Sequence, residues 1–244
     1  MKYFLDTEFI EGFHKPLLGK RRHFIDLISI GIVCEDGRTY YAISNEYNFN
    51  NADEWVKKNV IVPLYLKAVS GDNRNRYGAN TFHKAYGKSV KQISEEIKEF
   101  VYLEGQHIVS ETTRLKDPLA YIDPQFLGYY CDYDWVLLCS LFGKMIDLPK
   151  GFPMYCIDLK QHLDQYMNEV LQSEKDLIID GINITRGALP EMWARKKVFM
   201  DKLKMCKNFP KLNGEHDALA DAKWNYALYK FITNDIPRSN AIHK

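Results

Sequence analysis

Short runs rich in apolar and β-forming residues predict β-strands at the start of the chain. Residues 2–9 form a short run rich in aromatic and β-forming residues, residues 26–34 a second, β-branched run, and residues 38–44 a third. The turn sequence EDG at 35–37 joins the last two runs, which predicts a β-hairpin. We therefore expect the sheet to begin with antiparallel strands and its first strand to be central.

Apolar residues then recur at helical spacing. A short helix is predicted from Asp53, with Asp53 or Asn51 as its candidate N-cap, and the polar stretch 71–80 indicates an exposed loop. A longer helix is predicted from Ser89 to Tyr102, where Ser89 is the candidate N-cap.

The second half of the chain alternates strands with helices. Residues 126–131 predict a buried strand followed by a helix from Asp134 to about Phe142, and residues 154–159 predict a strand that runs into another helix. A basic helix is expected at 188–206. The last helix is expected at 218–232, with a buried stripe of Leu219, Ala222, Tyr226 and Tyr229. This order favours an α/β fold with a mixed β-sheet flanked by helices, and the lack of a linker-like stretch favours a single domain over residues 1–244.

Composition limits the classes of protein that fit the chain. With 244 residues, 46% hydrophobic residues and a formal net charge of +1, it has the composition of a soluble globular protein without a global basic field. Its five cysteines form no CxxC pair, which favours reduced thiols and a cytoplasmic location. We expect no membrane association, because no apolar stretch is long enough to span a bilayer and no apolar leader follows Met1.

Five residues carry the candidate chemistry: Asp6, Glu8, Asp134, His216 and Asp221. Asp6 and Glu8 are two apart on a predicted strand, so their side chains leave the same face. Gathering four carboxylates is costly unless cations neutralise them, and hard oxygen ligands suit Mg²⁺ or Mn²⁺. If the residues converge, two such ions can promote in-line displacement at a phosphodiester, and His216 can accept the proton of the attacking water.

Each residue also has a purely structural interpretation. Asp6 and Glu8 fit the polar face of an edge strand, and Asp134 fits a helix N-cap. His216 and Asp217 fit capping and dipole chemistry at the start of the last helix. Their joint occurrence in this order is what favours a shared site.

The same residues resemble the motifs of the DEDDh group of 3′–5′ exonucleases, which share a ribonuclease H-like fold. DTEF at 6–9 matches the Asp-x-Glu strand motif, Tyr133-Asp134 matches the aromatic-Asp pair of the second motif, and His216 to Asp221 matches the third motif of His, four residues and Asp. The resemblance implies that Asp6, Glu8, Asp134 and Asp221 bind two Mg²⁺ or Mn²⁺ ions and that His216 is the general base. Asp134 is preferred over Asp132 because it follows the aromatic residue.

Within that group, HDALADAKW and YYCDYDWVLLCSLFG are similar to the motifs of the small bacterial exoribonuclease AS subgroup. This resemblance implies hydrolysis of RNA 3′ ends to nucleoside 5′-monophosphates, and it allows a homodimer. Two alternatives stay open, which are a 3′–5′ DNA exonuclease of the same fold and a non-catalytic nucleic-acid-binding module.

Other residues are weaker candidates for substrate binding. Phe9 and Ile10 follow the acidic pair and could stack on a terminal base, although core packing explains them equally well. Arg195, Lys196 and Lys197 open a basic segment suited either to a phosphate backbone or to a solvated helix face. The cluster from Lys20 to His23 allows the same two interpretations.

Overall fold

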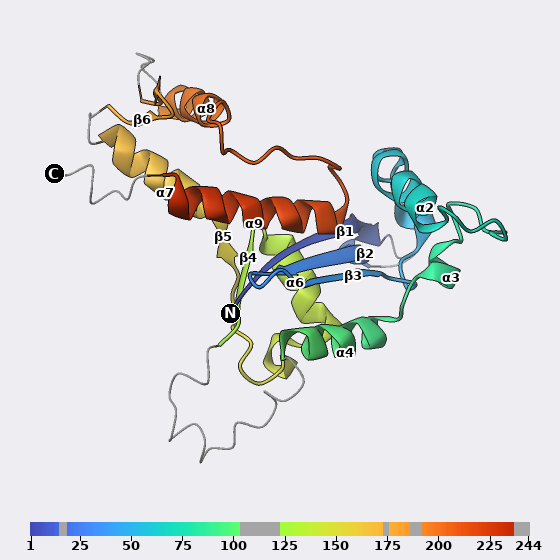
Figure 1. Ribbon diagram of the computed structural model, residues 1–244. Helices are drawn as coiled ribbons and strands as arrows, with labels where there is room; N and C mark the ends of the chain where they lie inside the picture. Colours follow the sequence, from blue (N-terminus) through green and yellow to red (C-terminus); the bar gives the residue numbers. More distant parts are fainter. Residues whose placement is uncertain (15–18, 103–122, 173–175, 186–191, 237–244) are drawn as a thin grey trace.

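The computed structural model describes residues 1–14, 19–102, 123–172, 176–185 and 192–236. Its centre is a five-stranded sheet in the order β3-β2-β1-β4-β5 (Figure 1). β1 (Lys2–His14), β2 (Arg22–Cys34) and β3 (Thr39–Ile43) are antiparallel neighbours, whereas β4 (Gln125–Gly128) and β5 (Ile157–Asp158) run parallel to β1. The predicted hairpin and the central place of the first strand are confirmed.

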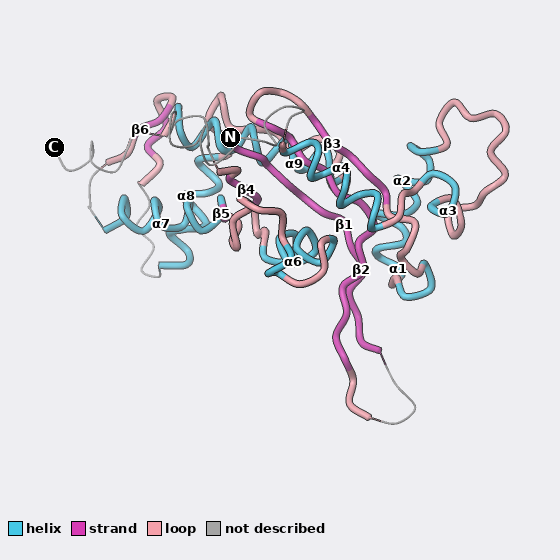
Figure 2. Tube along the Cα trace, turned by 90° about the horizontal axis from the view of Figure 1, so that it is seen from below, coloured by secondary structure: helices cyan, strands magenta, loops and turns pink. Residues whose placement is uncertain are grey.

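β1 and β2 are longer than their apolar patterns predicted. Their pairing continues as far as His14 opposite Arg22, so a two-stranded ribbon projects beyond the rest of the sheet (Figure 2). Helices cover β1 as far as Ile10, which is buried in the core. Farther out, the exposed residues Glu11, Phe13, Arg22 and His23 continue the backbone pairing, and the apolar runs at 2–9 and 26–34 did not predict this extension.

Helices cover both faces of the sheet. α9 (Ala218–Asn234) lies on one face, and α4 (Val90–Val101) and α6 (Asp132–Leu141) lie on the other (Figure 1). Beside the antiparallel strands β1, β2 and β3 lie four short helical segments. They are α1 (Glu54–Val56), a π-helical segment (Lys57–Ile61), α2 (Val62–Ala68) and α3 (His83–Tyr86). The remaining elements are α7 (Leu159–Gln172), α8 (Met192–Leu203), the small strands β6 (Ile178–Ile179) and β7 (Ile182–Asn183), and 3₁₀ turns at Phe49–Asn51 and Met145–Asp147.

Two helix starts match their predicted caps. Asp53 accepts a hydrogen bond from the backbone N–H of Val56 at 2.8 Å, and Ser89 accepts one from Gln92 at 3.2 Å. The predicted loop at 71–80 is largely exposed. The basic helix expected at 188–206 is observed as α8, and positions 188–191 of that prediction lie outside the described residues.

The buried stripe of the last helix differs from the predicted one. Of the four residues expected, only Ala222 is buried, while Leu219, Tyr226 and Tyr229 are half-buried. The observed stripe follows a neighbouring helical row that contains one polar residue, and it consists of Ala218, Ala222, Asn225, Leu228 and Phe231. The predicted stripe was chosen by apolar character, so it left out Asn225, which is buried because it has a hydrogen-bond partner described below.

Three groups of buried residues hold these layers together. One lies between the sheet and α4 with α6, the second between the sheet and α7, α8 and α9, and the third where Ile10, Ile28 and Ile43 meet Val60 and Ile61. All five cysteines are free thiols. Among the described residues, no helix combines the length and apolarity needed to cross a membrane. A five-stranded mixed sheet flanked by helices confirms the predicted α/β, ribonuclease H-like fold class.

Candidate active site

The central strand presents two carboxylates on one face of the sheet. Asp6 lies opposite Gly31 of β2 and Glu8 lies opposite Ser29, so both side chains leave β1 on the same side. The ladder then changes register between Glu8 and Phe9, where β2 holds one extra residue. A β-bulge of this kind bends the strand and redirects its side chains, and it occurs here directly after Glu8.

α9 brings the third carboxylate to the same place. Asp217 caps this helix by accepting a hydrogen bond from the backbone N–H of Ala220 at 3.0 Å, and Asp221 follows one turn later. Farther along, the side-chain amide of Asn225 donates to the carbonyl oxygen of Leu5 at 2.9 Å. This bond satisfies the buried amide and fixes α9 beside the residue that precedes Asp6.

Close approach of α9 requires a glycine on β2. A Cβ atom added to Gly31 would lie 2.4 Å from the carbonyl oxygen of Ala218 and 2.5 Å from the Cα of Leu219. The first turn of α9 therefore rests on the backbone of β2, opposite Asp6. Only glycine leaves that space free.

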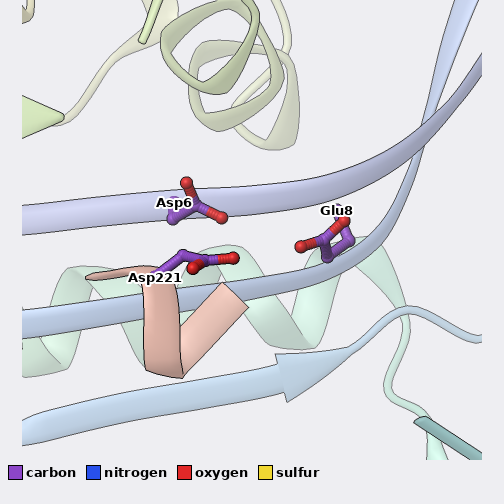
Figure 3. Close-up of side chains that lie close together, drawn as sticks. All are labelled: Asp6, Glu8 and Asp221. Atoms are coloured by element: carbon purple, nitrogen blue, oxygen red, sulfur yellow. The ribbon is translucent and has the colours of Figure 1, made fainter. Parts of the chain in front are cut away.

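The three carboxylates converge. One oxygen from each of Asp6, Glu8 and Asp221 lies within 4.8 Å of the other two, and Figure 3 shows the groups pointing toward one another. Two of them come from one strand and the third from a helix near the other end of the chain. We call this group the carboxylate cluster. It contradicts the interpretation of Asp6 and Glu8 as a polar edge, because β1 is the central strand and helices cover both faces.

The electrostatics of the cluster are unfavourable for carboxylates alone. Burial, followed by the charges of Asp134 and Glu8, raises the pKa of Asp6 well above its ordinary value. Burial and the charge of Asp221 raise the pKa of Glu8 to about 8. Burial also raises the pKa of Asp221 to about 6, although a backbone hydrogen bond from His216 opposes this shift. A divalent cation would relieve this repulsion, and all-oxygen donors suit Mg²⁺ or Mn²⁺.

Asp134 stands on the other side of β1 and is held by Thr7. Its Oδ1 accepts hydrogen bonds from the Thr7 backbone N–H at 2.8 Å and from the Thr7 hydroxyl at 2.6 Å. Burial outweighs these bonds and raises the pKa of Asp134 to about 6. Asp134 is not one of the three residues with mutually close oxygens, but its charge is the largest charge effect on Asp6.

The start of α6 differs from both earlier interpretations of Asp134. The helix begins at Asp132 with Cys131 in the N-cap position, so Asp134 is neither the cap nor the first helical residue. Asp132 is exposed whereas Asp134 is buried. The preference for Asp134 over Asp132 as a site residue stays a prediction.

His216 lies just before α9 in a left-handed backbone conformation, with φ of 66°. Its backbone N–H donates to Oδ2 of Asp221 at 3.0 Å, so the unusual backbone turn ties this residue to the cluster. Its imidazole meets the ring of Trp55 edge to face, with ring centroids 4.8 Å apart. Within the described part of the chain, no hydrogen bond of this imidazole is observed. The capping role suggested for both His216 and Asp217 holds for Asp217 alone.

The weaker candidates have different environments. Phe9 is half-buried, and its ring meets Tyr133 edge to face at 5.6 Å. Ile10 is only 1% exposed and packs in the core, so the suggestion that it stacks on a base is wrong for this structure. The physical reason is packing, because Ile10 lies in a buried group with Val60, Ile61 and Leu64 of the helical segment beside the sheet.

The basic residues Arg195, Lys196 and Lys197 lie on α8. This helix packs beside α7, whereas the carboxylate cluster lies at the N-terminal end of α9 (Figure 1). Arg195 and Lys197 are exposed and Lys196 is half-buried. The structure does not bring these three residues to the cluster.

Sequence patterns did not reveal four residues that shape the site, which are Thr7, Gly31, Trp55 and Asn225. Thr7 was visible inside DTEF, but only the fold shows that it binds Asp134. Gly31 interrupts an apolar strand, which is a known sign of close backbone approach. Asn225 interrupts an apolar helix face, and no local sequence signal connects Trp55 with His216.

Comparisons with known proteins agree with this geometry. No family model matches the chain. Two curated proteins from Mycobacterium tuberculosis, strains CDC 1551 / Oshkosh and ATCC 25618 / H37Rv, are named 3′–5′ exoribonucleases. The chain is 32% identical to each over 161 residues, which is 66% of this chain and 73% of each relative. The chain therefore belongs to the family of these 3′–5′ exoribonucleases and is a 3′–5′ exonuclease.

Proposed function

We propose that this protein is a DEDDh-type exoribonuclease that uses two Mg²⁺ or Mn²⁺ ions to hydrolyse RNA 3′ ends to nucleoside 5′-monophosphates. The observation that carries the proposal is the convergence of Asp6, Glu8 and Asp221 from β1 and α9. Asp134 completes the set of four acidic residues from the opposite helix layer. Residues 1–244 are proposed to act as one exonuclease domain.

The four carboxylates are proposed to hold the ions. Asp6 is the natural shared ligand, because it lies on the central strand and is influenced by the charges of both Glu8 and Asp134. Both hydrogen bonds from Thr7 go to Oδ1 of Asp134, so its Oδ2 is available to bind an ion. Bound Mg²⁺ or Mn²⁺ would supply Lewis-acid activation of the phosphate and of the attacking water.

His216 is proposed to accept the proton from the attacking water. Its backbone N–H donates a hydrogen bond to Asp221, so the residue lies directly beside the carboxylate cluster. Trp55 meets the imidazole edge to face, and the imidazole nitrogen atoms have no described hydrogen bond. Histidine is the side chain that most often serves as a general base in catalysis.

RNA is proposed as the substrate because both relatives are named exoribonucleases. Preference for RNA requires a contact to the 2′-hydroxyl, and acceptors of the carboxylate cluster are suited to receive its hydrogen bond. The sharp comparison uses RNA and DNA of one sequence, single-stranded and labelled at the 5′ end. Stepwise shortening of the RNA from its 3′ end, much faster than that of the DNA, is the expected result.

The test of mechanism is loss of activity in EDTA and its return with Mg²⁺ or Mn²⁺. Asp134→Asn should bind oligonucleotide but release no mononucleotide, whereas Glu99→Gln, an exposed change on α4, should behave like the natural protein. Equal hydrolysis of DNA and RNA would favour a DNA exonuclease. Binding of RNA without any hydrolysis or Mn²⁺ uptake would favour a non-catalytic module. A cytoplasmic location and a possible homodimer stay predictions.

A further inference from the structure

The two-stranded ribbon formed by residues 9–14 and 22–27 projects from the sheet beside the site (Figure 2). We call this ribbon the arm. It begins directly after Glu8, at the β-bulge, so its base adjoins the carboxylate cluster. The cluster accounts for hydrolysis of the terminal nucleotide and requires none of the residues farther out on the arm.

Aromatic rings follow one face of the arm. Phe9 meets Tyr133 of α6 with ring centroids 5.6 Å apart, Tyr133 meets His23 at 6.2 Å, and His23 meets Phe13 at 5.5 Å. Phe9 follows Glu8 in the chain and Tyr133 precedes Asp134. The row of rings therefore starts at the neighbours of two acidic residues of the site and leads away from them.

The outer rings are open to solvent. Phe13 is 58% exposed and Tyr133 is 44% exposed, although large apolar side chains usually gain stability by burial. Phe13 and His23 are directly opposite each other in the β1–β2 ladder, and their rings meet edge to face across the ribbon with 66° between the ring planes. Exposed rings of this kind form stacking platforms for the bases of single-stranded nucleic acid.

Positive charge lies at the outer end of the same ribbon. Lys20, Arg21 and Arg22 are exposed and, within the described residues, form no ion pair with an acidic side chain. The acidic residue nearest to them in the ladder, Glu11, is instead paired with His23 at 3.5 Å. A formal net charge of only +1 for the chain makes this local cluster a distinct electrostatic feature.

We propose that the arm binds the single-stranded RNA that lies upstream of the 3′-terminal nucleotide. Bases stack on Tyr133, His23 and Phe13, and phosphates contact Lys20, Arg21 and Arg22. This inference rests on the proposed function, since it names how the same site receives a long substrate. The combination of rings and cations on one ribbon matches RNA better than a second copy of this nearly neutral chain.

The inference predicts that the arm matters only for long substrates. Phe13 lies four residues beyond Phe9, about 13 Å along the strand, so a dinucleotide bound at the cluster does not reach it. Phe13→Ala should raise the KM for a single-stranded RNA of about twenty nucleotides roughly tenfold, because stacking on one ring is lost. The kcat for that RNA and both constants for a dinucleotide should change less than about twofold.

Charge removal gives an independent readout. Replacing Lys20, Arg21 and Arg22 together by alanine should weaken binding of the long RNA and reduce its dependence on salt. Each phosphate contact with a single strand contributes about 0.7 to the slope of log affinity against log salt, so the slope should fall by about 2. Binding is measured by fluorescence anisotropy in Ca²⁺, which prevents turnover, using the Asp134→Asn background as a second safeguard.

Matched controls separate the arm from general effects. Ile146→Ala removes an apolar side chain that is even more exposed than Phe13, at 78%, on the 3₁₀ turn Met145–Asp147, and Lys91→Ala with Lys98→Ala removes charge from α4. Circular dichroism and thermal unfolding check that each variant is folded. Equal losses in the controls and the arm variants would overturn the inference.

The outcomes distinguish this inference from the proposed function. If the natural protein hydrolyses dinucleotides and long RNA with the same KM, and the arm variants do likewise, the arm inference fails while the exonuclease assignment stands. If the natural protein hydrolyses neither substrate, the proposed function itself fails. If the arm variants alter the molecular mass in light scattering rather than RNA affinity, the arm is a contact between protein copies and the inference is overturned.

Discussion

Gly31 lies directly opposite Asp6 in the β1–β2 ladder, and the space left by its missing side chain is filled by the backbone of Ala218. This relationship sets how closely the first turn of α9 approaches β1. Asp221 follows Ala218 on the same helix. The glycine therefore determines how closely Asp221 approaches Asp6 and Glu8, which lie far from it in the chain. The position of Asp221, a proposed metal ligand, thus depends on a glycine that carries no functional group.

Gly31→Ala should therefore disturb both stability and activity. The new Cβ would lie 2.4 Å from a backbone oxygen, so α9 must move, at a cost of about 1–3 kcal/mol for an overpacked core. Moving Asp221 should reduce kcat more than tenfold, roughly the effect of a 1.4 kcal/mol rise in the barrier. Thermal unfolding and single-turnover hydrolysis measure the two effects. Gly78→Ala in the exposed loop is the control, and an unchanged kcat in Gly31→Ala would contradict this account.

Asp6→Asn should abolish hydrolysis and also stabilise the metal-free protein. The change keeps the shape of the side chain while removing a buried charge that Glu8 and Asp134 repel. We expect a higher Tm than that of the natural protein in EDTA and a smaller rise in Tm when Mn²⁺ is added. Differential scanning fluorimetry with and without Mn²⁺ provides the comparison. The expectation fails if Asp6→Asn lowers the Tm of the metal-free protein.

The metal-free protein should lose stability as pH rises. The pKa of Glu8 is about 8 and that of Asp221 about 6 in the folded protein, above ordinary values of 4.5 and 3.8. A raised pKa means that the folded protein holds these protons more tightly than the unfolded chain does. The resulting penalty begins near pH 4 and grows until about pH 8, where Glu8 ionises in the folded state as well.

In EDTA, the Tm should accordingly fall between about pH 5 and about pH 8, and Glu8→Gln should make the fall shallower. Mn²⁺ binds the ionised carboxylates, so the stabilisation it provides should increase over the same range. Parallel pH series of thermal unfolding, with EDTA and with Mn²⁺, measure both trends. A Tm of the metal-free protein that rises over this range would rule out the mutual repulsion described for the cluster.

Thr7→Val should loosen Asp134 while preserving the shape of the strand. It removes the hydroxyl bond of 2.6 Å but keeps the backbone bond of 2.8 Å. A hydrogen bond to a charged group contributes about 1.5–3 kcal/mol, so we expect that loss of stability together with weaker Mn²⁺ binding. Thr7→Ser retains the hydroxyl and should preserve most of both properties. Isothermal calorimetry measures the affinity, and equal affinities in the two variants would remove the positioning role assigned to Thr7.

Trp55 should act by positioning His216. Its ring contacts the imidazole edge to face at 4.8 Å, although Trp55 itself is 54% exposed. Trp55→Ala should lower kcat several-fold and broaden or shift the acidic limb of the pH–rate profile, because a freer imidazole is placed less well. Trp55→Phe keeps an aromatic contact and should recover most of the rate. A change in KM alone, with the pH profile unaltered, would instead assign Trp55 to substrate contact.

The convergence of Asp6, Glu8 and Asp221 was predicted from the sequence, because strand spacing placed Asp6 and Glu8 on one face and the resemblance to the DEDDh motifs added Asp221. It also favoured Asp134 over Asp132, which agrees with the burial of Asp134. It did not reveal the partner of Asp134, since a contact between Thr7 and a residue 127 positions later depends on how the layers pack.

Errors occurred where apolar content was used as the measure of burial. Ile10 was placed near the substrate by its closeness to Glu8 in the chain, whereas packing with Val60 and Ile61 buries it in the core. The stripe on α9 was misplaced because Asn225 is buried by virtue of one hydrogen bond rather than apolar character. The arm was not predicted, because its outer residues lack the apolar pattern of a strand that helices cover.

The bond from Asn225 to Leu5 joins residues 220 positions apart. During synthesis, β1 leaves the ribosome long before α9 exists, so Asp6 and Glu8 emerge without the helix that brings Asp221 beside them. Contacts of such long sequence separation form late and slowly in folding. Nuclease activity is therefore expected to appear only when α9 docks on the sheet, because that step brings Asp221 beside Asp6 and Glu8.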